Sequence, residues 1–264
     1  MKPEDIERVK DLLPTSLGSD EIRREIAADI LRRSVFSSRM AYAAYLAKVR
    51  EVCTAMLEGR ISQADARDRL ETVLDQMGHS MQDAGGLRNP ASIRRLNLIL
   101  ETQTQMAASV AQLAEQTDSV VELWPGWLLT RLEGRRAPRE DWIARWNAAG
   151  ESVDWEGARR GPVYSDGTSF AFAALKSSPI WQALGDGAGG FNDTLGNPYP
   201  PFAYSSGMGW EDLERETCEQ YGLIRPGEAA EAPGARSLTP SDGELAEAAD
   251  RYGFKDLLEG FENA

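Results

Sequence analysis

The strongest constraint on the fold is an apolar stripe that recurs with helical spacing between residues 91 and 115. Asn89-Pro90 precedes it, a pair typical of an N-cap followed by proline at the first helical position. Large apolar side chains then return every three or four residues, at Ile93, Leu96, Ile99, Leu100, Met106, Val110 and Leu113. Because this spacing places them on one face, we predict a helix from about Ala91 to Glu115 with that face buried.

An earlier segment has the same kind of periodicity. Isoleucines stand at every fourth position, Ile22, Ile26 and Ile30. Ser19 or Asp20 can serve as the N-cap of this segment. We therefore predict a helix through the three isoleucines, with their side chains in the core.

A helical hairpin is predicted between these two segments. Apolar side chains at threefold and fourfold steps indicate a helix over residues 36–57, and Gly59 suits the C′ position that ends it. Ser62 and Asp65 resemble a capping box, with Asp in place of the usual Glu, at the start of a third helix over residues 63–81. Since the joint between the two helices is short, we expect them to lie antiparallel.

The pattern changes beyond Gln116, where tryptophans become frequent. The apolar run over residues 120–129, interrupted by Pro125-Gly126, predicts short strands or an apolar turn. Short helices are predicted over residues 138–150 and 210–221, with a long Gly- and Pro-rich loop over 185–209 between them. The helix over 210–221 would carry a solvated acidic face formed by Glu211, Asp212, Glu214, Glu216 and Glu219.

These patterns predict a mainly α fold with a smaller α/β (α+β) second domain. The long helical hairpin and the fourth helix come first, and a Trp-rich mixed domain follows. We expect a helical N-terminal region over residues 1–88, a mixed domain over 89–224, and a flexible acidic linker with a C-terminal helix over 225–264.

Charge and composition narrow the function classes. The net charge is −13 and the pI is near 4.7, which disfavours broad contact with DNA phosphates because that contact relies on Lys and Arg. No run approaches the ~18–20 apolar residues of a membrane helix, and no apolar signal core opens the chain, so we expect a cytoplasmic protein without membrane contact. Protein partners are favoured, with a local DNA contact left open at Arg94-Arg95, Arg135-Arg136 with Arg139, and Arg159-Arg160.

Residues for catalysis or metal binding are sparse. His79 is the only histidine, and Cys53 and Cys218 lie far apart, so neither a nucleophilic triad nor a zinc site is predicted. The glycines over residues 185–190 can offer backbone N–H groups to a phosphate, but no Gly-Lys-Ser/Thr follows, and Asp186 would repel the anion. We predict no catalytic, cofactor-binding or metal-binding residue, and both cysteines are expected to be buried thiols.

The aromatic residues of the second half are the candidate protein-interaction residues. Large aromatic side chains bury much area at low entropic cost, and neighbouring prolines stiffen the backbone, so an exposed copy suits a binding anchor. The alternative is that these residues form the core of the second domain. The candidates are Trp124, Trp127, Pro198, Tyr199, Pro200, Pro201 and Phe202.

The order of several motifs resembles the phage Mu F-like head morphogenesis family of minor capsid proteins. The resemblance begins with Phe36-Ser37-Ser38-Arg39 and the Glu58-Gly59-Arg60-Ile61 joint. It continues through the arginine, apolar run and Thr/Glu/Gln residues over 94–107, then Leu123-Trp124-Pro125 and the Pro-rich run 197–202, and covers roughly residues 14–224. The histidine and the cysteine-arginine-cysteine of better-known members are missing here.

The resemblance implies a minor head protein of a phage or prophage, associated with the portal and capsid proteins, found in the virion or in the host cytoplasm during assembly. It implies no enzyme activity and no cofactor, and it leaves open whether the chain forms an oligomer. The alternative is an enzyme of nucleotide or ADP-ribosyl chemistry that uses the glycine-rich loop at residues 185–190.

Overall fold

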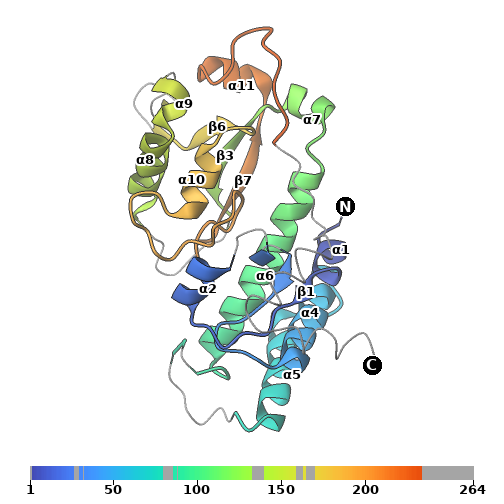
Figure 1. Ribbon diagram of the computed structural model, residues 1–264. Coiled ribbons are helices and arrows are strands. Elements are labelled where there is room, and N and C mark those ends of the chain that lie inside the picture. The colour runs from blue at the N-terminus through green and yellow to red at the C-terminus, as the bar shows by residue number, and fades with distance from the viewer. Residues whose placement is uncertain are drawn as a thin grey trace. The chain divides into compact units, whose positions relative to one another are not determined.

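The structure, a computed structural model, describes residues 2–26, 30–31, 33–79, 86–87, 89–132, 140–158, 163–164 and 170–233 (Figure 1). Its helices and small sheets form a mixed α+β fold, with the described residues up to Ala108 in a first compact unit and those from Ser109 in a second. The elements in chain order are α1 (Pro3–Arg8), β1 (Asp11–Leu12), α2 (Ser19–Glu25), β2 (Ser34–Val35), α4 (Ala43–Leu57), α5 (Gln63–Gln76), α6 (Ile93–Ala114), α7 (Asp118–Leu123), β3 (Gly126–Arg131), α8 (Trp142–Ser152), α9 (Asp154–Ala158), β4 (Val163–Tyr164), β5 (Phe170–Ala171), β6 (Ala173–Leu175), α10 (Ile180–Asp186), β7 (Met208–Leu213) and α11 (Arg215–Gln220).

The hairpin of α4 and α5 forms the centre of the first unit. The predicted capping box is confirmed, because Ser62 Oγ accepts from the Asp65 N–H at 3.2 Å and the Asp65 carboxylate accepts from the Ser62 N–H at 3.0 Å. At the opposite end, Tyr42 before α4 contacts His79 after α5, so the two helices run antiparallel. Buried side chains of α4, α5 and the start of α6 make one core, including Leu46, Val49, Leu70, Leu74, Leu96 and Leu100.

Three helices of the first unit are shorter than predicted, and the one expected over residues 63–81 ends at Gln76. The first ends at Glu25, because Ile26 already has extended backbone, with φ −102° and ψ 126°. The second begins at Ala43, because Arg39 has a φ of 55° and Met40 forms an antiparallel bridge with Thr15. Pairing with a distant segment, which helical periodicity does not report, overrides the helical spacing there.

A three-stranded antiparallel sheet, in the order β6-β3-β7, organises the second unit. The helices α8 and α10 lie side by side next to it (Figure 1). Trp181 of α10 makes edge contacts with Trp127 of β3 and Trp210 of β7, which fixes this helix on one face of the sheet. The core of this unit is therefore largely aromatic.

The second unit corrects two predictions of secondary structure. Residues 210–213 were expected in a helix, but they belong to β7, because the register with β3 places Trp210 opposite Leu129 on the buried face. The run 120–129 was expected as short strands or an apolar turn, but its first residues belong to α7, whose N-cap Thr117 accepts from the Val120 N–H at 3.4 Å. The glycine end of the last helix is confirmed, with Gly222 at φ 69° and Leu223 buried.

The boundary between the units falls inside α6. A boundary between residues 88 and 89 was expected, at the start of this helix. The first half of α6 packs with the first unit instead, because Leu96 and Leu100 complete the core of the hairpin. From residue 234 on, the expected linker and C-terminal helix over 225–264 lie outside the described residues.

Candidate interaction surface

Most of the predicted interaction residues are buried. The exposed fraction is 1% for Trp127, 1% for Tyr199 and 0% for Phe202, and Pro200 and Pro201 are buried as well. Pro198 is half-buried, and Trp124 is 37% exposed. The interpretation of Pro198–Phe202 as an exposed anchor is therefore corrected, and Trp124 is the predicted residue that remains available to a partner.

The burial of these residues has a geometric cause. The rings of Trp127 and Trp210 stack with centroids 3.7 Å apart and an interplanar angle of 8°. Phe202 stacks on Trp181 at 6.0 Å and meets Trp210 edge-on at 6.0 Å, so the Pro-rich segment closes the aromatic core. Stacked and edge-to-face aromatic pairs stabilise by about 0.5–1.5 kcal/mol beyond the area that they bury.

A buried lysine completes the polar side of this core. Lys176 Nζ lies 2.6 Å from Asp212 Oδ1, which also accepts from Trp127 Nε1 at 2.9 Å, and Lys176 donates to Gln116 Oε1 at 2.6 Å. Burial lowers the pKa of Lys176 from its ordinary value of 10.5, although the hydrogen bond and charge of Asp212 oppose this. Because the Lys176 side chain is 0% exposed, no substrate reaches the amine, and its contacts are those of a packing residue.

A buried arginine holds the glycine-rich loop in place. Arg145 of α8 forms ion pairs at 2.9 Å with Asp141, the N-cap residue of α8, and with Asp193 of the loop. Its guanidinium carbon also lies 4.2 Å from the ring centroid of Phe191 and 5.4 Å from that of Trp142. Arg145 therefore links the loop to α8 by charge and by cation–π contacts.

The glycines of this loop serve close packing and turns. A Cβ at Gly185 would overlap the backbone carbonyl oxygen of Asn197, and one at Gly187 would overlap that of Phe191. The N–H groups of Gly187, Ala188, Gly190 and Phe191 all donate to carbonyl groups within residues 183–187. These donors are thus already used, whereas a phosphate loop presents its donors outward.

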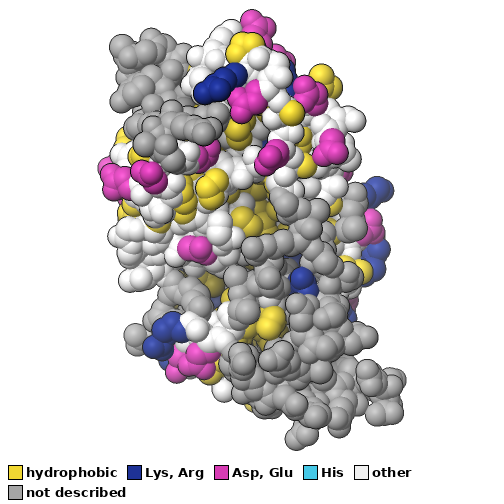
Figure 2. Space-filling view, turned by 45° about the horizontal axis from the view of Figure 1, so that its top comes forward, with side chains coloured by type: hydrophobic (Ala, Val, Ile, Leu, Met, Phe, Trp, Pro, Cys, Tyr) yellow, Lys and Arg dark blue, Asp and Glu magenta, His cyan; other side chains and the backbone are white. Residues whose placement is uncertain are grey.

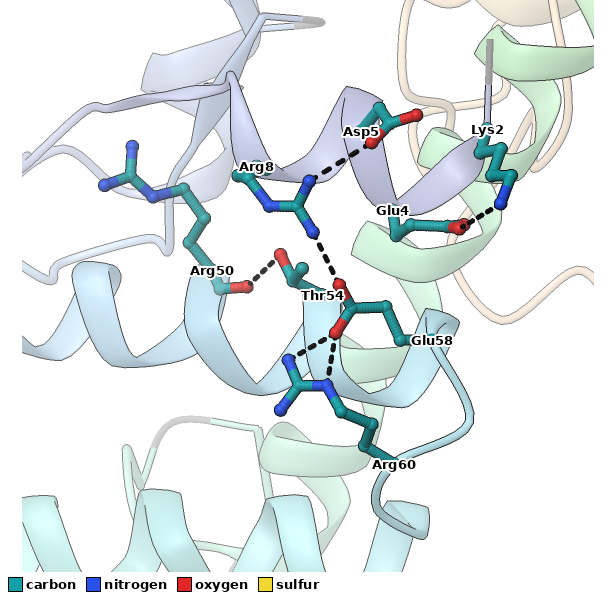
Figure 3. Close-up of polar contacts among 8 residues, drawn as sticks. All are labelled: Lys2, Glu4, Asp5, Arg8, Arg50, Thr54, Glu58 and Arg60. Carbon is teal, nitrogen blue, oxygen red and sulfur yellow. Dashed lines mark hydrogen bonds and ion pairs between the residues drawn. The ribbon is translucent and has the colours of Figure 1, made fainter.

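In the first unit, α1 is attached by polar contacts at two depths. At the surface, Arg8 Nη2 lies 2.5 Å from Glu58 Oε1, and Arg60 contacts the same carboxylate (Figure 3). Below it, Lys10 Nζ lies 2.7 Å from Glu7 Oε2 and donates to Gln103 Oε1 at 3.0 Å. Glu7 and Lys10 thus form a buried ion pair, with side chains 0% and 2% exposed.

Burial perturbs the ionisable groups around this pair. Desolvation raises the pKa of Glu7, against the lowering effect of Lys10. It also raises the pKa of the Cys53 thiol well above its ordinary value, so Cys53 is an unreactive core residue. The prediction that both cysteines are buried thiols is confirmed.

One expected arginine cluster can be located. Arg95 is buried and donates to Ser37 Oγ at 2.9 Å and to Ser38 O, so only Arg94 of this pair faces solvent. The clusters Arg135-Arg136 with Arg139 and Arg159-Arg160 lie outside the described residues. The described pair therefore presents a single charge to solvent, too little for a DNA-binding patch.

The exposed apolar residues at the end of α7 form the candidate surface. Leu123 is 58% exposed and Trp124 37%. Beside them, Arg215 at the start of α11 donates to Glu122 O at 2.8 Å and pairs with the Glu122 carboxylate at 3.0 Å. In Figure 2, where the top of Figure 1 comes forward, several acidic side chains lie among hydrophobic ones at the top, together with a basic side chain.

Sequence reasoning missed part of this surface. The exposure of Leu123 could have been inferred from its position at the end of a short capped helix, next to Trp124 and before Pro125. The acidic residues over 211–219 were noticed, but they were placed on a single helix, whereas the structure divides them between β7 and α11. Only the pairing of β7 with β3 brings them next to α7.

Comparison with models of protein families, with curated proteins and with solved structures finds no match. Across the part of the chain that the structure describes, no group of three or more His, Cys, Asp or Glu side chains is placed to hold a metal ion. Within the same residues, no helix is long and apolar enough to cross a membrane.

Proposed function

We propose that this chain is a structural and interaction protein of a phage or prophage head, a minor head protein that associates with the portal and capsid proteins during assembly. The observation that carries the proposal is the exposed pair Leu123 and Trp124, which directly precedes β3, the strand that carries Trp127 of the aromatic core. Tryptophan is among the residues most enriched at the energetically central positions of protein interfaces, and Leu123 extends the apolar area beside it. The resemblance in motif order to Mu F-like head proteins supplies the biological setting.

The alternative, nucleotide or ADP-ribosyl chemistry at residues 185–190, gains no support from the geometry. The N–H groups that would hold a phosphate donate within the turn, and Gly185 packs against the backbone of Asn197. The nearby guanidinium, that of Arg145, is already paired with Asp141 and Asp193. A phosphate would have to displace these carboxylates.

Co-expression with phage portal and capsid proteins tests the proposal. We expect a stable complex on co-purification and sizing. The double variant Leu123→Ser, Trp124→Ser should lose the complex, whereas Ile143→Ser, which changes a side chain 55% exposed on α8, should retain it. A chain that stays alone in every combination, and that a nucleotide stabilises against heat, would replace this proposal by the enzymatic alternative.

A further inference from the structure

The surroundings of Leu123 and Trp124 specify a partner chemistry. The register of β3 and β7 pairs Gly126 with Leu213 and Trp127 with Asp212. If this register is extended two residues beyond the strands, Trp124 falls opposite Arg215. This placement agrees with the hydrogen bond from the Arg215 side chain to the Glu122 carbonyl oxygen. The exposed apolar pair therefore lies beside the start of α11.

This neighbourhood is strongly acidic. Residues 211–219 contain five carboxylates and one basic residue, Arg215. The guanidinium of Arg215 is occupied, because it contacts Glu122 at 3.0 Å and Glu219 at 3.7 Å and donates to Glu228 O at 3.0 Å. Exposed carboxylates near the apolar pair come from three neighbouring elements, Asp118 on α7, Glu211 on β7, and Glu214 and Glu216 at the start of α11. Glu122 and Asp212 are exposed as well, but their carboxylates are paired with Arg215 and Lys176.

We propose that this acidic apolar surface docks a basic amphipathic segment of a partner protein. Apolar side chains of the segment cover Leu123 and Trp124, while its Lys or Arg side chains face the exposed carboxylates. The inference rests on the proposed function, since it names the chemistry of the segment that a head protein would offer. Opposite charges on the surface and on the partner make binding specific and association fast. Added salt screens these charges and weakens the attraction.

Charge argues against other occupants. A second copy related by a twofold axis would place the same carboxylates opposite one another, and a nucleic acid would add phosphates to them. Both arrangements bring like charges together around an apolar centre. A basic segment with an apolar face can both cover Leu123 and Trp124 and pair with the surrounding carboxylates.

A synthetic probe tests the proposal without any head protein. The probe is a labelled helical peptide of leucines and lysines with one apolar and one basic face, and its binding to the full chain is followed by fluorescence anisotropy at low and moderate salt. We expect Leu123→Ser with Trp124→Ser to weaken binding about tenfold or more, as for the central residues of an interface. Ile143→Ser should change it less than about twofold, because a lone exposed residue outside the interface contributes little.

A second set of variants distinguishes the effect of the carboxylates around Leu123 and Trp124 from the effect of the net charge of the protein. Removing three carboxylates of the surface, by Asp118→Asn, Glu214→Gln and Glu216→Gln, should weaken binding and reduce its salt dependence. The same loss of charge at the exposed Glu140, Glu151 and Asp154, by Glu140→Gln, Glu151→Gln and Asp154→Asn, should have a smaller effect. Thermal unfolding establishes that each variant is folded before it is compared.

Several results would overturn the proposal: no binding of the peptide by the parent chain, equal losses in both triple variants, or equal binding of a serine-lysine peptide without an apolar face. A dimer that Trp124→Ser dissociates would assign the surface to a second copy. Because no head protein takes part, peptide binding with no head-protein complex would overturn the proposed function alone. A complex that survives loss of Leu123 and Trp124 would overturn the docking surface alone.

Discussion

Lys176 and Asp212 form an ion pair in which one partner is sealed from solvent and the other is open to it. Their Nζ and Oδ1 atoms are 2.6 Å apart, while the side chains are 0% and 40% exposed. The cost of breaking such a pair depends on which charge is left behind. Water can solvate a lone Asp212, but it cannot reach a lone Lys176.

Removal of the anion should therefore cost more than removal of the cation. We expect Asp212→Asn to lower the free energy of unfolding by about 3 kcal/mol, the low end for a broken buried pair, because Asp212 is itself partly solvated. Lys176→Met should cost about 1 kcal/mol, since it mainly removes hydrogen bonds and keeps the packing. Urea denaturation of both variants checks the order, and the reverse order would show that the buried ammonium is not the costly partner.

Lys176 should make the free energy of unfolding depend on pH in the alkaline range. Because burial lowers its pKa below 10.5, the folded chain releases this proton before the unfolded chain does. The unfolded state then holds more protons, so the contribution of Lys176 to the unfolding free energy rises with pH between the lowered pKa and 10.5. The difference between the parent chain and Lys176→Met, measured by urea denaturation, should grow across this window; a constant difference would contradict it.

Glu7 should act in the opposite sense. Burial raises its pKa above the ordinary 4.5, so the folded chain holds this proton more tightly than the unfolded chain. The stabilisation that Glu7 gives the folded state is therefore complete below pH 4.5, and it is lost as the pH rises through the raised pKa. The stability of the parent chain relative to Glu7→Gln should thus fall as the pH increases above 4.5, which paired urea titrations measure. A relative stability that increases over this range would mean that pairing with Lys10 outweighs burial.

Two glycines of the loop allow the cost of a steric overlap to be compared with the cost of a left-handed backbone conformation. Gly185→Ala should destabilise by about 3 kcal/mol or more, because the new methyl group overlaps the Asn197 backbone, which cannot move aside. At Gly190 an added Cβ meets nothing within 4 Å, but the φ is +90°. Gly190→Ala should then cost only the left-handed penalty of about 1–2 kcal/mol. Thermal denaturation compares the two, and equal effects would argue against the close approach at Gly185.

Buried and exposed aromatic residues should separate stability from binding. Phe202→Ala opens a cavity in the aromatic core and should cost about 3–5 kcal/mol. Trp124→Ala removes a side chain at the surface and should cost less than about 1 kcal/mol, while it weakens partner binding. Chemical denaturation measures both values. A Phe202→Ala chain of unchanged stability would restore the segment Pro198–Phe202 as an exposed anchor.

The sequence by itself determined the helices whose signals are local. The capping box of Ser62 and Asp65, the stripe that forms α6 and the glycine that follows α11 all act through contacts within a few residues of each other. Periodicity and capping report such contacts directly. The mixed α+β class also followed from the change of pattern beyond Gln116.

Only the tertiary structure decided which aromatic residues face solvent and where the acidic residues lie. Trp124 and Trp127 are three residues apart and chemically identical, yet strand pairing and stacking on Trp210 bury one and leave the other at the surface. Residues 208–213 became a strand because β3 offered them hydrogen bonds and a buried face, a preference that no local spacing encodes. Burial and strand pairing depend on residues distant in the chain, so a candidate interaction surface built from α7, β7 and α11 emerges only when these segments meet.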